Sequence, residues 1–426
     1  MGSQAYLALT FFLFTYACII SEKIHRTIIA MVGAVLLVIT GIVSQEHALH
    51  YIDFNTLGLL IGMMILVAIT SQTGLFKYMA IKAAKLAKGR PAAILIYLSL
   101  ITAVASAFLD NVTTVLLIVP ITFSIAHSLR VNPIPYLISE ILAANIGGTA
   151  TLIGDPPNIM IGSAVPKLDF MAFLTNLAPI VILIMFVTLT LLYFIFRKQL
   201  VTTPDLQDKI MELNEKEELT DIRLLVKSLI VLGLTITGFV IHNLLGLETA
   251  TIALTGAFFL LLITGENYLE DALLQIEWTT LFFFVGLFIL VGGLVETGVI
   301  DLLAKKVMSL TGGEAMSSAF LILWLSAIAS AFVDNIPFVA TMIPLIKGLG
   351  HLGIENIEPL WWSLSLGACL GGNGTVIGAS ANVIVIGLAM KDGYRISFLG
   401  FMKIAFPLML LSILMSNLYL YLVYFM

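Results

Sequence analysis

The sequence contains a long internal repeat, in which a polar motif of the first half returns in the second half. Ala-Phe-Leu-Asp-Asn at 107–111 recurs as Ala-Phe-Val-Asp-Asn at 331–335, an offset of 224 residues. The glycine-rich segment 147–158 recurs as 371–382 at the same offset, again beginning with Gly-Gly and ending with Asn. Because the alignment holds without a gap from Ile52 to Asn158, we expect the two halves to share one fold.

Composition places this repeat in a membrane. The chain has 426 residues, of which 60% are hydrophobic and 11% charged, whereas a soluble domain is about 25% charged. Several apolar runs reach the ~20 residues that cross a bilayer as a helix, and short alternating segments of the kind found in β-barrels are absent from the sequence. The fold class that we expect is an all-α polytopic membrane protein.

Hydropathy divides the chain into two membrane repeats, 1–197 and 223–426, joined by an acidic linker, 198–222. The first apolar run lacks the positive start and the cleavage site of a signal peptide, so we interpret it as a spanning helix. The expected spans are 4–20, 27–44, 55–72, 136–164 (interrupted at 147–157) and 174–196, then 224–243, 249–264, 279–295, 360–389 and 398–424.

Each repeat also holds a paired apolar segment, 92–129 and 316–350, with Asp-Asn between its two arms. The arms fit either two full crossings or one re-entrant hairpin. We favour the hairpin, because a charged tip at membrane depth needs burial in protein or a wet cavity. Either way each repeat crosses the membrane an odd number of times, so the second copy is inverted, as in many secondary transporters.

Positive charge predicts the orientation. If the basic stretch 75–90 is cytoplasmic, all but four of the 21 Lys and Arg residues (Lys167, Lys305, Lys306 and Lys347) fall on the cytoplasmic side, as the positive-inside rule requires. We therefore expect a multi-pass protein of the cell inner (plasma) membrane with a cytoplasmic linker.

The aspartates at the two tips are the first candidates for chemistry. An ionised carboxylate inside a membrane faces a cavity, pairs, or binds a proton or cation. Asp110 and Asp334 are therefore expected to hold the coupling ion. The alternative is that each aspartate caps the helix that follows it, and both roles can coexist. Asn111 and Asn335 add an amide and a carbonyl at each tip, and Thr113 and Thr114 add hydroxyl groups in the first repeat only.

The glycine-rich segments break their helices, because Gly-Gly followed by Pro-Pro or a third Gly does not continue a helix. Such a break exposes carbonyl groups to a cation at Gly148 and Gly372, or else it is a close helix contact. Asp155, whose counterpart is Ala379, serves ion coupling or caps a helix. Glu140 is interpreted as lying near the cytoplasmic interface or pairing with a base, with a proton relay as the alternative.

These motifs resemble those of the ion transporter superfamily. The residues that carry the resemblance are 107–114, 145–158 and 369–382, and the P protein (pink-eyed dilution) branch is the most similar, ahead of arsenite pumps and sodium/proton antiporters (ArsB/NhaD-like). The resemblance implies the fold of the divalent-anion/sodium symporters, with paired hairpins, broken helices, a homodimer and elevator-type alternating access. Those symporters carry Ser-Asn-Thr at the tips, whereas this chain has Asp-Asn-Val and Asp-Asn-Ile.

Two acidic tips disfavour a di- or tricarboxylate and favour H⁺, Na⁺ or a neutral hydroxide. The leading hypothesis is a secondary active transporter of a small inorganic or metalloid ion, coupled to H⁺ or Na⁺. The alternatives are arsenite/antimonite efflux, Na⁺/H⁺ antiport, and a passive channel on the same scaffold. No enzyme motif, cofactor motif or metal-ligand motif is present in the sequence. The expected substrate-binding residues are Thr113, Thr114, Thr149, Thr151, Asp155, Asn158, Asn373, Thr375 and Asn382.

Overall fold

The computed structural model describes residues 2–21 and 23–426, which fold almost entirely as helices. The first half comprises α1 (Ser3–Ile20), α2 (Arg26–Ile39), α3 (Gln45–Tyr51), α4 (Phe54–Ser71), α5 (Leu75–Leu86), α6 (Pro91–Phe108), α7 (Asn111–Leu129), α8 (Ile134–Thr149), α9 (Pro156–Ala164) and α10 (Phe170–Phe196). The linker contains α11 (Pro204–Glu212). The second half comprises α12 (Ile222–Leu245), α13 (Thr249–Thr264), α14 (Leu269–Leu274), α15 (Trp278–Glu296), α16 (Val299–Thr311), α17 (Ala315–Phe332), α18 (Asn335–His351), α19 (Glu358–Gly371), α20 (Ser380–Lys391) and α21 (Phe398–Leu420).

The repeat is structural as well as sequential. At the offset of 224 residues, α6 and α17 begin and end at equivalent residues, and α7 begins one residue after Asp110 as α18 does after Asp334. Gly74 before α5 and Gly298 before α16 share the left-handed conformation, with φ of 79° and 71°, which glycine adopts without strain. Each helix of the first half therefore has a counterpart in the second.

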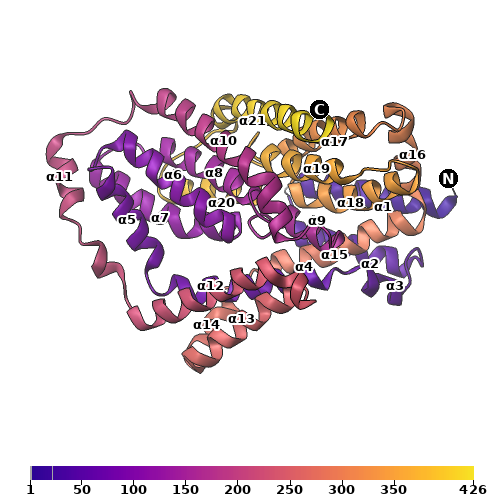
Figure 1. The fold of residues 1–426 in the computed structure, drawn as a ribbon, viewed down its shortest axis with the longest axis horizontal. Coiled ribbons are helices and arrows are strands. Elements are labelled where there is room, and N and C mark those ends of the chain that lie inside the picture. The colour runs from indigo at the N-terminus through magenta and orange to yellow at the C-terminus, as the bar shows by residue number, and fades with distance from the viewer. Residues whose placement is uncertain (1, 22) are drawn as a thin grey trace.

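The helices form two groups, which we name the scaffold and the hairpin bundle. The scaffold consists of α1–α4 and α12–α15, in which α4 packs on α13 and α15 packs on α2. The hairpin bundle consists of α5–α10 and α16–α21, in which α8 packs on α6 and α19 packs on α17. Figure 1 shows the hairpin α6–α7 and the hairpin α17–α18 toward opposite ends of the long axis. Their connecting turns meet, because Asp110 of the first and Asn335 of the second line one cavity.

The expected spans agree with the structure in most places. Among the described residues, nine helices are long and apolar enough to cross a membrane, and the chain is a polytopic helical membrane protein. The predicted span 249–264 matches α13, and the interrupted span 136–164 matches α8 and α9. The short helices α3 and α14 were not predicted, and Trp361 and Trp362 of α19 are buried in the protein.

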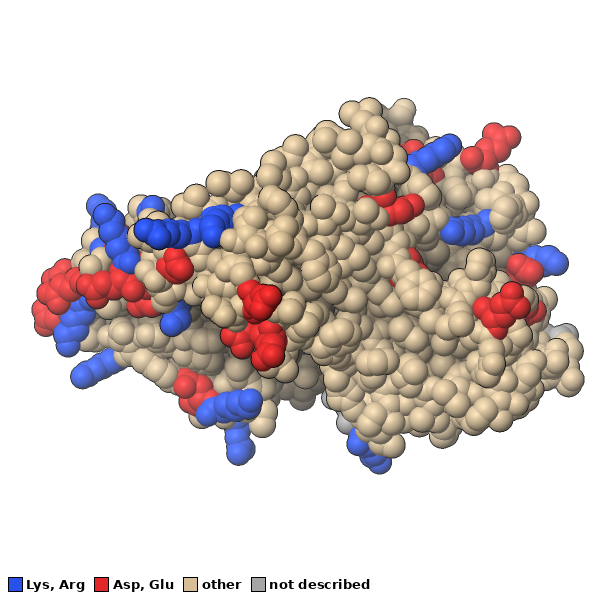
Figure 2. Space-filling view, turned by 90° about the horizontal axis from the view of Figure 1, so that it is seen from below, with Lys and Arg blue, Asp and Glu red and all other residues tan. Residues whose placement is uncertain are grey.

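The linker lies against one end of the hairpin bundle. Lys85 of α5 pairs with Glu215 at 2.6 Å and donates to the carbonyl of Leu213 at 2.9 Å. This hydrogen bond lowers the pKa of Glu215. Figure 2 shows most charged side chains of that face at the end that carries α5 and α11, with a second set at the opposite end and a largely uncharged surface between them.

Candidate functional site

The two hairpin tips are capped by their aspartates. Asp110 accepts from the backbone N–H of Thr113 at 2.8 Å and from its hydroxyl at 2.5 Å. Asp334 accepts from the backbone N–H of Ile336 at 3.1 Å. Capping therefore occurs at both tips. Within the described chain, both oxygens of Asp110 accept from Thr113 alone, whereas Oδ2 of Asp334 also accepts from Arg26 and Ser380.

Close backbone contact explains the glycines at the start of each broken segment. A Cβ on Gly147 would lie 2.1 Å from the carbonyl oxygen of Ala103, and one on Gly371 would lie 2.5 Å from that of Ala327. A Cβ on Gly148 would lie 2.5 Å from the carbonyl oxygen of Gly154, and one on Gly372 would lie 3.1 Å from that of Gly378. The glycines at 147 and 371 let the broken helices pack directly on the hairpin arms. The cation role expected of Gly148 and Gly372 stays a prediction.

Hydroxyl groups fix the same contact in both repeats. Ser106 donates to the carbonyl of Ala144 at 2.7 Å, and its counterpart Ser330 donates to that of Ala368 at 2.6 Å. Thr151 and Thr375 donate to the carbonyls of Ala107 and Ala331. These last two threonines, expected to bind substrate, therefore tie the broken segments to the hairpins.

Buried asparagines join the two repeats at their centre. Asn145 accepts from Asn111 at 3.1 Å and donates to Asn373 at 2.9 Å and to Asn382 at 3.0 Å. Asn158 donates to the carbonyls of Thr149 and Thr151 and accepts from Ser365 at 2.6 Å. Asn145 was missed from the sequence, although its counterpart Cys369 breaks the repeat there.

A small cavity of about 20 Å³ lies between the tips, which is enough space for about one water molecule or one small ion. Both hairpins, the starts of α9 and α20, and the scaffold contribute to its lining. The predicted residues in this lining are Asp110, Asn111, Asp155 and Asn335. The lining residues that sequence reasoning missed include Arg26, Glu277, Thr280 and Ser380.

Asp155 faces this cavity and does not cap α9. The residue is 1% exposed, and its Oδ1 receives a long hydrogen bond of 3.4 Å from Asn335. Its Oδ2 is buried and has no hydrogen-bond partner among the described residues. A buried carboxylate oxygen without a partner is costly, so Asp155 is suited to bind a proton or a cation.

Four carboxylates and one guanidinium meet around this cavity. Asp110, Asp155 and Glu277 line it, and Asp334 lies beside it in an ion pair with Arg26. Among the described residues, Arg26 is the only Lys or Arg that lines the cavity. The charge balance therefore favours the entry of cations or protons over that of anions.

The other predicted site residues lie away from this cavity. Thr113 donates a hydrogen bond to Asp110, the hydroxyl of Thr114 is buried without a partner in the described chain, and Thr149 donates to the carbonyl of Asn145.

Two expectations need correction. Glu140 is 1% exposed, accepts from Thr122 at 2.5 Å and forms no ion pair among the described residues, so it does not pair with a base. Arg26, counted as an interface charge, reaches the second tip.

Comparison with known proteins identifies the family. The sequence matches the CitMHS family, described as citrate transporter, over residues 16–367. The chain belongs to this family. It is 43% identical to an uncharacterized transporter of Mycobacterium tuberculosis over 98% of each chain. It is 38% identical to the human P protein, covering 93% of this chain and 57% of that protein.

Two solved structures are similar to this CitMHS protein in fold. The YdaH transporter of Alcanivorax borkumensis has a TM-score of 0.58 and 15% identity, covering 98% of each chain. MtrF of Neisseria gonorrhoeae, from a class of antimetabolite efflux pumps, has a TM-score of 0.58 and 11% identity, covering 99% of this chain and 94% of its own. The predicted resemblance to the ion transporter superfamily and the P protein is confirmed. The protein is a secondary transporter and not an enzyme.

Proposed function

We propose that this protein moves a small inorganic or metalloid ion, coupled to H⁺ or Na⁺, by elevator-type alternating access. One observation carries the proposal. Asp110 and Asp155 line a buried cavity between the two hairpin tips, and neither is within ion-pair distance of a basic side chain in the described part of the chain. Because burying an unpaired charge is costly, a proton or a cation is needed at this pair.

The arrangement in the membrane is part of this proposal. Residues 1–197 and 223–426 are two inverted repeats, the linker 198–222 is cytoplasmic, and each hairpin enters from its own side. The opposed directions of the hairpins in Figure 1 support the inversion. The basic side chains of α5 beside the linker support its cytoplasmic placement.

The coupling ion is assigned to the first tip. Asp110 provides two carboxylate oxygens that accept only from Thr113, and Asp155 provides the oxygen that lacks a partner among the described residues. Oxygen donors of this kind suit a hard cation or a proton. The asparagines and glycines around Asn145 hold the two tips in place rather than contacting the cation.

The description of the family, citrate transporter, makes citrate a candidate cargo. A free tricarboxylate would meet Asp110, Asp155 and Glu277 with Arg26 as the single compensating base. Repulsion between like charges disfavours it, and we propose a positively charged or neutral cargo instead. Citrate supplied with Mg²⁺ belongs in the test, because a bound cation reduces the charge.

The test uses purified protein in proteoliposomes, with currents and pH changes recorded for a panel of Na⁺, H⁺, arsenite, antimonite, phosphate and citrate gradients. Uphill movement of one ion driven by another supports a coupled transporter, whereas a passive channel only dissipates the gradients. Asp110→Asn is expected to reduce the coupled flux at least tenfold. Asp221→Asn, which changes an exposed aspartate that caps α12, is the matched control. Undiminished pH-dependent exchange in Asp110→Asn would contradict the proposal.

A further inference from the structure

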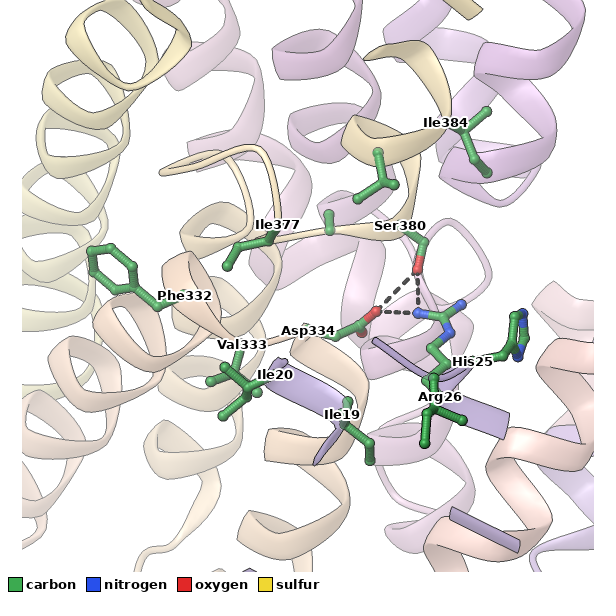
Figure 3. A pocket seen from close by; sticks show the side chains of 13 residues that line it. Ile19, Ile20, His25, Arg26, Phe332, Val333, Asp334, Ile377, Ser380 and Ile384 are labelled. Carbon is green, nitrogen blue, oxygen red and sulfur yellow. Dashed lines mark hydrogen bonds and ion pairs between the residues drawn. The ribbon is translucent and has the colours of Figure 1, made fainter. Parts of the chain in front are cut away.

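Arg26 forms an ion pair with the tip of the second hairpin. Figure 3 shows its guanidinium directed at Asp334 and Ser380 in a pocket of about 340 Å³. Nη1 of Arg26 donates to the carboxylate of Asp334 and, at 2.8 Å, to the hydroxyl of Ser380. The hydroxyl of Ser380 also lies 3.0 Å from the same carboxylate. The Asp334 side chain is 11% exposed, so the guanidinium neutralises a largely buried charge.

The first hairpin has no equivalent base. The counterpart of Arg26 is Ala250, whose backbone N–H donates to Asn55 within the scaffold. Asp110 is not within ion-pair distance of a Lys, Arg or His in residues 2–21 and 23–426. One tip is thus neutralised by the protein itself, while the other depends on a solvent ion.

Arg26 is held by the scaffold, whereas its partners belong to the hairpin bundle. Its guanidinium lies 4.9 Å from the ring centroid of Phe283 on α15, and the hydroxyl of the next residue, Thr27, donates to the carbonyl of Thr279 at 2.7 Å. Asp334 and Ser380 begin α18 and α20. The ion pair therefore crosses the junction between the two groups of helices.

This junction has a different register in the two repeats. The α1–α2 turn lies against Asp334 and Ser380, so symmetry would place the α12–α13 turn against Asp110 and Pro156. Instead residues 242–249 lie against Gly162 and Asp169, farther along the bundle. The two repeats share one fold but contact each other differently at these two junctions. If each repeat took the contacts that the other now makes, a second arrangement with the same types of contact would result. In that second arrangement Arg26 no longer contacts Asp334.

We propose that Arg26 is a tethered substitute for a coupling cation at Asp334, displaced by H⁺ or Na⁺ when the hairpin bundle moves along the scaffold. This inference rests on the proposed function and deepens it. In the present arrangement a single mobile cation is required, at Asp110 and Asp155. After the movement Asp334 has lost its guanidinium and takes a cation from solvent, so Arg26 determines the coupling stoichiometry.

Other titratable or charged groups face this carboxylate and must be considered in a pH experiment. They are His25 and Tyr16 from the α1–α2 region, Glu277 from α15, and Asp110 and Asp155 from the first repeat. The experiment therefore compares variants at equal pH and never interprets a single titration curve by itself.

The test measures thermal stability of the detergent-purified protein in NaCl or choline chloride of equal ionic strength, at pH 6, 7 and 8. Arg26→Gln leaves Asp334 without its base. The thermal unfolding midpoint of this variant is therefore expected to fall in choline chloride at pH 8, and to recover in NaCl or at pH 6. A bound cation stabilises the folded state in this way. Arg26→Lys is expected to behave like the natural protein, and Arg223→Gln, at the exposed start of α12, is the matched control.

A double variant separates charge from packing. Arg26→Gln combined with Asp334→Asn removes both charges, and its extra dependence on Na⁺ or H⁺ is expected to disappear. The proposal is overturned if Arg26→Gln matches the natural protein in every buffer, or if it is equally destabilised in all of them. Because this measurement needs no transport, it can succeed where the flux experiment fails, and the two proposals are distinguished.

Discussion

Asn145 and Asn373 connect the broken helices of the two repeats, with the side-chain amide of Asn145 2.9 Å from the Oδ1 of Asn373. Both residues are buried, at 0% and 1% exposure. Asn145 also contacts Asn111 at the first tip and Asn382 on α20. A single amide therefore joins one tip to both halves of the second broken helix.

Replacing this amide is expected to destabilise the protein. Asn145→Ala leaves the amide of Asn111 and the carbonyl oxygens of Asn373 and Asn382 with one partner fewer. A buried polar group left without its partner costs about 1–3 kcal/mol. Thermal unfolding in detergent measures the loss, with Asn267→Ala, at an exposed position before α14, as the control. An unchanged midpoint would show that water replaces the amide.

Gly147→Ala is expected to prevent stable folding. The new Cβ would lie 2.1 Å from the carbonyl oxygen of Ala103. Overpacking costs about 1–3 kcal/mol, and occasionally more; here the atom in the way is backbone, which cannot change its rotamer. Gly371→Ala in the second repeat is expected to act in the same way. Gly387→Ala, where the new Cβ has no neighbour within 4 Å, serves as the control. Size-exclusion profiles and unfolding midpoints check the result, and a monodisperse, stable Gly147→Ala protein would contradict it.

Asp155→Asn is expected to separate stability from transport. The substitution removes a buried charge whose Oδ2 has no partner in the described chain, so the unfolding midpoint should rise or remain constant. Coupled flux should fall at least tenfold, because the amide of Asn carries no charge with which to bind H⁺ or a cation. A gain in stability with a loss of activity is the usual trade-off at a functional site. Asp392→Asn, outside the cavity, is the control. A destabilised but fully active variant would assign Asp155 a structural role.

The linker is expected to detach from α5 when Glu215 is neutralised. Its hydrogen bond from Lys85 lowers its pKa from the ordinary value of 4.5. The attachment is therefore complete above pH 4.5 and is lost as the pH falls through the lowered value. Glu215→Gln imitates this loss at neutral pH. Hydrogen exchange of residues 213–218 should be faster in this variant than in Glu212→Gln, and equal rates would show that the ion pair does not hold the linker.

Local patterns predicted the helices well, but they did not predict contacts between repeats. The span 249–264 was correct because its apolar run ends at Gly265 and begins after a charged residue. Asp110 and Asp155 were proposed as site residues because charge is rare in an apolar chain, and both line the cavity between the tips. Arg26 was missed because its partner lies 308 residues away in the sequence. In addition, the positive-inside rule assigns every Lys or Arg near the end of a spanning helix to one side of the membrane. The mismatch of Arg26 with Ala250 was the available signal.

The glycine contacts also determine where this molecule can deform. At Gly147 and Gly371 the hairpin arms touch the broken helices backbone to backbone, and the contact has no side chain that can change its rotamer. Interiors packed in this way transmit strain instead of absorbing it. Each hairpin and its broken helix are therefore stiff as a unit. In the proposed elevator movement, slippage is therefore expected at the junction where Arg26 meets Asp334, which long side chains and a few hydrogen bonds cross.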